Sequence, residues 1–396
     1  MKDQPVFEKR MDDFLALRRE EACRFSDHLG RNPETSGKEF ESSRLFVEVL
    51  RKNGFSVEFP FLGLPTAFMA RKISKGKPGA KVALLTEYDA LPEIGHACGH
   101  NAHGTMSLYA GLALGQVVEE TGGEVWVVGT PAEEEDGAKS AMSDQGVFDG
   151  VDLALMFHAF GRDSFTDYRS LALDGYDFTF KGKPAHAAAT PWEGISALHG
   201  VQLFLAAQDM LRLHLRPEAR LHAIITEGGA ATNIIPESAS CRVEFRAPKR
   251  PYLDKVAEAV FNCARGAALA TGTEVSWQKF MLSFDDMLPN PTAEAVMKDI
   301  LADLGVACSS GQGPTGSTDV GNVSYRCPAI QPELAITPLP LSLHTREFAE
   351  ATMSPTGHEA IFLGSRALAR MGFRVLVDVE LREAMHRDFL SARQEG

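Results

Sequence analysis

The sequence has no long apolar run and no leader-like beginning. Its first residues read MKDQPVFEKRMDDFLALRREEACRF, a charged stretch without the apolar segment of a secretory signal. No apolar run approaches the roughly 20 residues that a membrane span requires. We therefore expect a cytoplasmic protein that does not bind a membrane.

Positive charge and cysteine are both scarce. The chain has 53 acidic and 40 basic residues and a formal net charge of −13, which argues against a nucleic-acid partner because such partners select basic surfaces. Six cysteines are scattered over 396 residues. Without an export signal they are expected to be reduced thiols, and most to be small buried hydrophobes. Only Cys98 lies in a context that suggests another role.

The chain is too long for one ordinary domain, and it shows no repeats or low-complexity segments. Its first part alternates strand-like and helix-like segments, which predicts an α/β layered domain. Three of the strand-like segments begin near residues 81, 124 and 151, and polar residues follow each of them. Sites in such sheets form outside the carboxyl ends of the strands, so we expect these polar groups to converge.

The pattern changes near residue 171. The order β-α-β-β-α-β over residues 171–283 resembles a ferredoxin-like α+β unit. Later segments return to the first pattern. We therefore predict a discontinuous catalytic domain, residues 1–170 and 284–396, with an inserted lid domain at 171–283. The strand LDGYDFTF (173–180) or one of its neighbours is expected to form a pairable edge of the lid sheet.

The segment GHACGHNAHG, residues 95–104, concentrates three histidines and a cysteine. Cys98 and His100 are ligand types suited to zinc and related metals. The alternative is an ordinary loop with histidines present by chance. A lone histidine is commonly structural, but His158 stands at the end of an apolar strand, where a ligand role is favoured. His344 alone would mean little.

The segment PAEEEDG, residues 131–137, places acids directly after a strand. Such runs are often solvated loops. Metal-assisted hydrolysis, however, needs one carboxylate as ligand and one as general base. Adjacent side chains in an extended segment point in different directions, so one glutamate can bind metal while its neighbour faces the substrate.

These motifs resemble the M20 metallopeptidase family, specifically its amidohydrolase branch, which includes aminoacylases and p-aminobenzoyl-glutamate hydrolases. The resemblance covers essentially the whole chain and rests on YDALP (88–92), HACGH (96–100), PAEE (131–134), GKPAHA (182–187), NIIP (233–236) and GSTD (316–319). It implies a zinc-exopeptidase-like catalytic domain with a mixed sheet, together with the inserted lid.

The resemblance also implies site residues. The metal ligands would be Cys98, His100, Glu134, His158 and His344. They would hold two divalent ions per subunit: zinc, manganese or cobalt. Glu133 would be the general base. His186 would reach from the lid of a partner subunit and stabilise the oxyanion, which implies a homodimer formed through the lid.

For the substrate, the resemblance assigns Asn233 to orientation and Arg246 to the carboxylate, which a guanidinium can grip bidentately. A lid-surface salt bridge is the alternative for Arg246. The backbone of Gly316 and Ser317 would complete this subsite. The expected activity is hydrolysis of the amide bond in an N-acyl amino acid, an aminobenzoyl-glutamate-like compound or a dipeptide with a free carboxylate.

Asp89, Asn101 and His103 are expected to support the ligands, with Glu87 close by. Asn101 departs from the branch, where many relatives have Asp. This residue and the segments AAATPWE (187–193) and GSTDVGN (316–322) resemble the subgroup of p-aminobenzoyl-glutamate hydrolases and related dipeptidases. Two alternatives remain: an inactive homologue that binds a small molecule, and a structural zinc protein. The spread of the ligands over some 250 positions argues against the second, because structural sites favour short Cys-rich modules.

Overall fold

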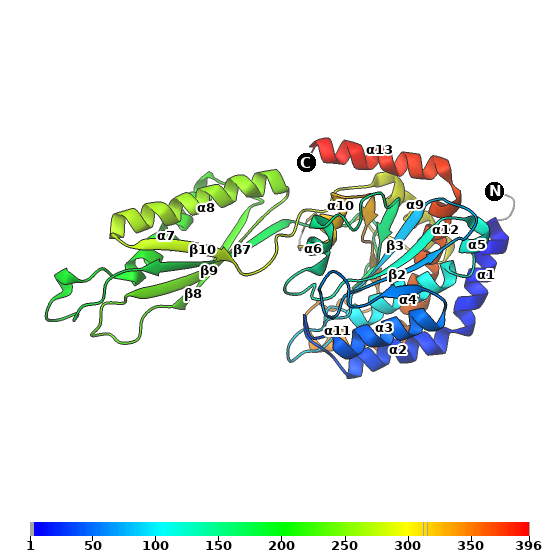
Figure 1. Ribbon diagram of the computed structural model, residues 1–396, viewed down its shortest axis with the longest axis horizontal. Coiled ribbons are helices and arrows are strands. Elements are labelled where there is room, and N and C mark those ends of the chain that lie inside the picture. The colour runs from blue at the N-terminus through cyan, green and yellow to red at the C-terminus, as the bar shows by residue number, and fades with distance from the viewer. Residues whose placement is uncertain (1–3, 312, 315, 396) are drawn as a thin grey trace. The chain divides into compact units, whose positions relative to one another are not determined.

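A computed structural model describes residues 4–311, 313–314 and 316–395 (Figure 1). The described residues form two compact units: one comprises residues 4–169 and the described part of 287–395, and the other comprises residues 170–286. We call them the first and the second unit. No helix in the described ranges is both long and apolar enough to cross a membrane.

The first unit is built on a mixed sheet, as predicted, and this sheet has six strands. Its spatial order is β1 (Ser56–Glu58), β2 (Phe68–Ile73), β4 (Glu124–Gly129), β3 (Lys81–Thr86), β5 (Leu153–Leu155) and β11 (Ala329–Ile330). Three pairs are parallel: β4–β3, β3–β5 and β5–β11. Two pairs are antiparallel: β1–β2 and β2–β4. A separate parallel pair joins β6 (His158–Phe160) to β12 (Glu333–Ala335).

Helices cover both faces of this sheet. They are α1 (Gln4–Leu17), α2 (Arg19–Arg31), α3 (Phe40–Lys52), α4 (His100–Leu114), α5 (Val118–Thr121), α6 (Ala138–Asp144), α9 (Pro291–Asp303), α10 (Val320–Ser324), α11 (Arg346–Thr352), α12 (Pro355–Val377) and α13 (Val379–Glu395). Val82 and Leu84 belong to one apolar cluster, with α1–α4, α9 and α12, while Ala83 and Leu85 belong to another, with α6 and α10. This alternation is the period of two that a strand buried on both faces requires.

Helix α4 is buried along its whole length. Two glycines allow α4 to pack closely against its neighbours. A Cβ on Gly111 would lie 2.3 Å from Val127 Cγ2 of β4, and a Cβ on Gly364 of α12 would lie 2.3 Å from Met106 Sδ of α4. The first residue of α4 is His100. The core helix therefore fixes a candidate ligand at its N-terminal end.

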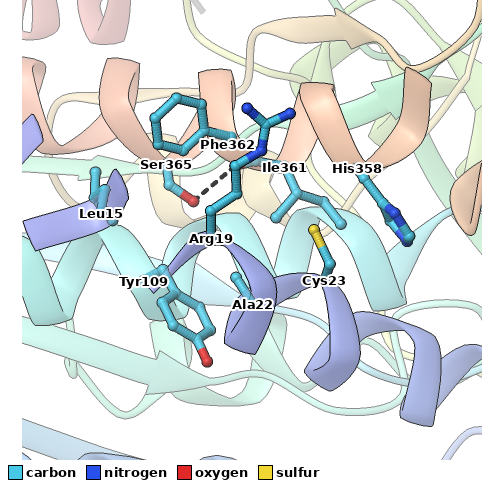
Figure 2. Close-up of a pocket in the computed structure, with 9 residues that line it drawn as sticks. All are labelled: Leu15, Arg19, Ala22, Cys23, Tyr109, His358, Ile361, Phe362 and Ser365. Atoms are coloured by element: carbon cyan, nitrogen blue, oxygen red, sulfur yellow. Dashed lines mark hydrogen bonds between the residues drawn. The ribbon is translucent and has the colours of Figure 1, made fainter. Parts of the chain in front are cut away.

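A small recess lies between α1, α2, α4 and α12 (Figure 2). Its lining is mostly apolar: Leu15, Arg19, Ala22, Cys23, Tyr109, His358, Ile361, Phe362 and Ser365. None of these nine residues is among the site residues predicted from the sequence. We regard the recess as a packing feature of the helical layer.

The second unit has the predicted β-α-β-β-α-β order: β7 (Ala172–Lys181), α7 (Ala197–Leu211), β8 (Arg220–Glu227), β9 (Ser238–Ala247), α8 (Arg250–Thr271) and β10 (Glu274–Lys279), with short 3₁₀ turns at Pro191–Glu193 and Arg212–His214. The antiparallel sheet has the order β10-β7-β9-β8. Phe178 and Phe245 of the sheet and Phe204 of α7 belong to its core.

The strand LDGYDFTF is not an edge. It lies within β7, which pairs with β10 on one side and β9 on the other. The prediction was wrong for this strand and holds only for its neighbours, because β8 and β10 are the outer strands. Strand β7 carries three buried aromatic or aliphatic side chains toward the helices, which suits an interior position.

Candidate metal centre

The structure brings the five predicted ligands together in the first unit. Cys98 and His100 stand at the start of α4, Glu134 follows β4, His158 begins β6, and His344 lies in the loop after β12. Two sets of three share the cysteine: Cys98, His100 and His158, and Cys98, Glu134 and His344. Within each set the ligand atoms lie within 4.8 Å of one another.

Cys98, the residue that both sets share, is buried, and its Sγ lies 3.4 Å from His158 Nε2. Burial alone would raise the pKa of this thiol, but His158, His100 and His344 hold it well below its usual value. The thiolate is the form that binds metal. The next residue, Gly99, has φ of 86°, and a Cβ there would lie 2.5 Å from Ala159 Cβ. The turn between the two ligands therefore requires glycine.

The donor atoms fit a divalent metal. His100 Nε2 and Glu134 Oε1 are buried and have no hydrogen-bond partner within the described ranges. A buried polar atom without a partner is costly, and here both atoms belong to the ligand sets. Nitrogen, oxygen and sulfur donors in this combination suit zinc and related ions.

Two carboxylates orient the histidine ligands. Asp89 Oδ1 lies 2.9 Å from His100 Nδ1, while its Oδ2 accepts hydrogen bonds from the Glu134 N–H at 3.1 Å and the Ser36 hydroxyl at 2.8 Å. Although burial opposes it, His100 lowers the pKa of Asp89 to about 2. Glu333 Oε2 lies 3.2 Å from His158 Nδ1. A carboxylate on the outer nitrogen fixes the ring and its tautomer.

Glu133 lies beside the ligands, among other acids. Its carboxylate oxygen and those of Glu87 and Asp319 lie within 4.8 Å of one another, and its Oε2 is 3.9 Å from His100 Nε2. Burial, followed by the charges of Glu87 and Glu134, raises the pKa of Glu133 well above its usual value. A carboxylate with a raised pKa in this position suits proton transfer.

A buried lysine, which the sequence analysis missed, forms ion pairs with two of these acids. Lys139 Nζ lies 2.7 Å from Glu87 Oε1 and 2.5 Å from Asp319 Oδ1, and its backbone N–H donates to Asp319 Oδ2 at 2.9 Å. All three residues are fully or almost fully buried. Burial opposes the charge of Lys139, yet Asp319 and Glu87 raise its pKa. The sequence offered one signal for this residue: Lys139 is a charged residue among the small side chains at the beginning of α6.

The remaining supporting residues have distinct places. His103 Nε2 lies 2.9 Å from Glu87 Oε2, and its Nδ1 accepts the Ala159 N–H at 3.1 Å, so it links α4 to β6. Asn101 donates to Ser26 and Thr352. Its amide therefore ties α4 to α2 and α11 and makes no hydrogen bond to a ligand in the described ranges.

His186, Asn233 and Arg246 all lie in the second unit. Exposed His186 accepts the N–H groups of Ala188 and Ala189 on Nδ1, each at 3.2 Å. The Ala187 N–H donates to the Asn233 carbonyl at 3.0 Å, so the His186 and Asn233 loops are neighbours. Arg246 of β9 donates to Glu244 at 3.3 Å.

Gly316 and Ser317 belong to the first unit, shortly before Asp319. A Cβ on Gly316 would lie 3.2 Å from the Tyr168 hydroxyl. A side chain at position 316 would therefore crowd that hydroxyl.

Comparisons with known proteins identify the family of this chain. Residues 172–271 match the peptidase dimerisation domain of M20 enzymes. A mouse Xaa-Arg dipeptidase is 34% identical over 348 residues, which cover 85% of this chain and 80% of the relative. The chain belongs to the M20 peptidase family.

Other M20-type relatives extend over nearly the whole chain. A p-aminobenzoyl-glutamate hydrolase component from Escherichia coli K12 is 28% identical and covers 96% of this chain and 94% of the relative. The crystal structure of a dinuclear metal-binding M20 peptidase from Bacillus subtilis has the same fold, with a TM-score of 0.67, 20% identity and coverage of 91% and 99%. The predicted family and fold are confirmed, and this M20 protein is a metal-dependent amidohydrolase.

Proposed function

We propose that this M20 protein cleaves the amide bond of a dipeptide, an N-acyl amino acid or an aminobenzoyl-glutamate-like compound that carries a free carboxylate. The two ligand sets that share Cys98, with Glu133 beside them, are the main support. The mouse relative is named for a C-terminal arginine and the E. coli relative for a glutamate. In both names the amino acid on the nitrogen side of the cleaved bond ends in a carboxylate.

The metal ions and the side chains around them have separate roles in the proposed reaction. Two divalent ions (zinc, manganese or cobalt) would, when bound, polarise the amide carbonyl and lower the pKa of water. Glu133 takes the proton of the attacking water and later gives it to the leaving nitrogen. Asp89 and Glu333 hold the rings of His100 and His158 in place.

The resemblance to the M20 family supplies the groups that we propose to hold the substrate. Arg246, with the backbone of Gly316 and Ser317, binds the substrate carboxylate, and Asn233 orients the amide. His186 of the partner subunit donates to the developing oxyanion; a preorganised donor of this kind is typically worth about 3 kcal/mol. The six free cysteines support the proposal of a cytoplasmic location.

The test is a substrate panel with the metal-loaded protein. Metal-free protein is reconstituted with zinc, manganese or cobalt and offered Xaa-Arg and Xaa-Lys dipeptides, aminobenzoyl-glutamate and N-acetyl amino acids. We expect amine release from one of these classes, and loss of that release when the substrate carboxylate is replaced by an amide. Tight binding of these compounds without any amine release would support the inactive binding protein instead.

We further propose a homodimer formed through the second unit. Strand β8 is an outer strand of its sheet, and Ile224 and Ile225 on it are 63% and 48% exposed. Met210 of α7 and Leu213 just beyond it are 72% and 84% exposed. An outer strand with free backbone groups and apolar neighbours is suited to pairing with a second copy.

Shared sites predict complementation between inactive variants. When Glu133→Gln and His186→Ala subunits are exchanged at equal amounts, half of the dimers are mixed and each mixed dimer has one intact site. Activity is therefore expected to return to about a quarter of wild type for a two-fold dimer. The control mixes Glu133→Gln with Cys98→Ala, whose defects lie in the same unit and should not complement. Subunit exchange verified by mass without recovered activity would exclude donation of His186 by the partner.

A further inference from the structure

Ala132, the residue before Glu133, has an unusual backbone. Its φ is 59°, in the left-handed region that residues other than glycine seldom adopt. Its carbonyl accepts the Gly137 N–H at 2.7 Å, which closes the turn that carries Glu133 and Glu134. A residue persists in such a conformation only when its surroundings fix it.

The backbone N–H of Ala132 contacts the carboxylate of Glu39. The Ala132 N–H donates to Glu39 Oε1 at 2.9 Å. Glu39 is fully buried and stands immediately before α3; its Oε1 also accepts the Gly37 N–H at 2.8 Å, and its Oε2 accepts the Thr66 hydroxyl at 2.9 Å. Three donors from separate segments leave this carboxylate one orientation. Glu39 is therefore held in place, and through the Ala132 N–H it contacts the turn that carries Glu133.

We propose that Glu39 is a positioning residue for Glu133. It lies outside both ligand sets and acts through Ala132: by holding that residue in the left-handed conformation, it directs the Glu133 carboxylate toward the substrate amide. This inference rests on the proposed function of Glu133. The competing interpretation is that Glu39 only stabilises the start of α3.

The first measurement compares kcat and KM in two substitutions of Glu39. Glu39→Ala is expected to lower kcat by about 10- to 100-fold, the scale of a misplaced reacting group, while KM stays within about threefold. Glu39→Gln is expected to restore most of kcat. Its amide oxygen can accept the Gly37 and Ala132 N–H groups, and its NH₂ can donate to the Thr66 hydroxyl.

Two further substitutions separate positioning from general stability. Thr66→Val removes a donor from the same buried carboxylate but leaves the contact with Ala132, so kcat should stay near wild type. Ala132→Gly adopts a positive φ without strain, so Glu39→Ala should cost several-fold less kcat in that background. A loss in Thr66→Val equal to that in Glu39→Ala, or purely additive effects of Glu39→Ala and Ala132→Gly, would overturn the proposal.

Hydrogen exchange resolved to single amides tests the contact without reference to activity. In the wild type the Ala132 amide should exchange much more slowly than those of Glu135 and Asp136, and Glu39→Ala should remove this protection. If no substrate is cleaved by the wild type, the proposed function fails while this measurement still tests the contact. If Glu39→Ala does not fold, a fast-exchanging Ala132 amide in the wild type would by itself overturn the proposal.

Discussion

Glu133→Gln is expected to retain its metal and to lose kcat by about 10²-fold or more. The glutamine keeps the size of the side chain but cannot take a proton from water, and a positioned acid–base group is worth about this factor. Metal should remain because Glu134, not Glu133, belongs to the set that includes Cys98 and His344. Metal content by mass spectrometry and kcat on the best panel substrate are the two measurements.

The chain offers two neighbouring controls for this prediction. Glu134→Gln removes a proposed ligand, so it should lose metal together with activity. Glu135→Gln changes an exposed glutamate of the same turn and should behave as wild type. If Glu134→Gln kept its metal while Glu133→Gln lost it, the two roles would be reversed.

Much of the fold could be predicted because the local pattern of apolar and polar residues indicates where strands and helices form. The apolar run of β3 and its abrupt end in polar residues predicted a buried parallel strand, and β3 is parallel to both of its neighbours. The β-α-β-β-α-β order of the second unit followed from period-two strands and two long helices. The position of β7 inside its sheet could not be predicted, since a strand's own alternation does not say which strands pair with it.

The residues of the candidate site also differ in how far the sequence could predict them. The ligands stand in short motifs at strand ends, and the topology of parallel strands brings such ends together. Lys139 and Asp319, by contrast, are 180 positions apart, and Glu39 is 93 positions from Ala132. A charged residue looks the same in sequence whether it is solvated or buried against a distant partner. Asp89 and His103 were predicted because they stand within or beside the ligand motifs, whereas Lys139 and Glu39, which support the site from outside those motifs, escaped the sequence analysis.

Cys98→Ala is expected to lose both bound ions and all measurable activity while the fold persists. Cys98 is the one residue common to the two ligand sets, so its removal leaves each set with two protein ligands. His158, His100 and His344 keep the pKa of its thiol low despite burial, which favours the metal-binding thiolate. The fold should persist because the apolar clusters on both faces of the sheet do not include Cys98.

A second buried cysteine provides the matched control. Cys327 packs in the apolar cluster with α6 and α10, and burial raises the pKa of its thiol. Cys327→Ala should therefore keep full metal content and activity, whereas Cys98→Ser, which retains a weaker oxygen donor, should bind metal less tightly than wild type. Metal stoichiometry, circular dichroism and activity are compared across the three variants. Unchanged stoichiometry and activity in folded Cys98→Ala would remove the thiolate from the centre, and with it the link between the two ligand sets.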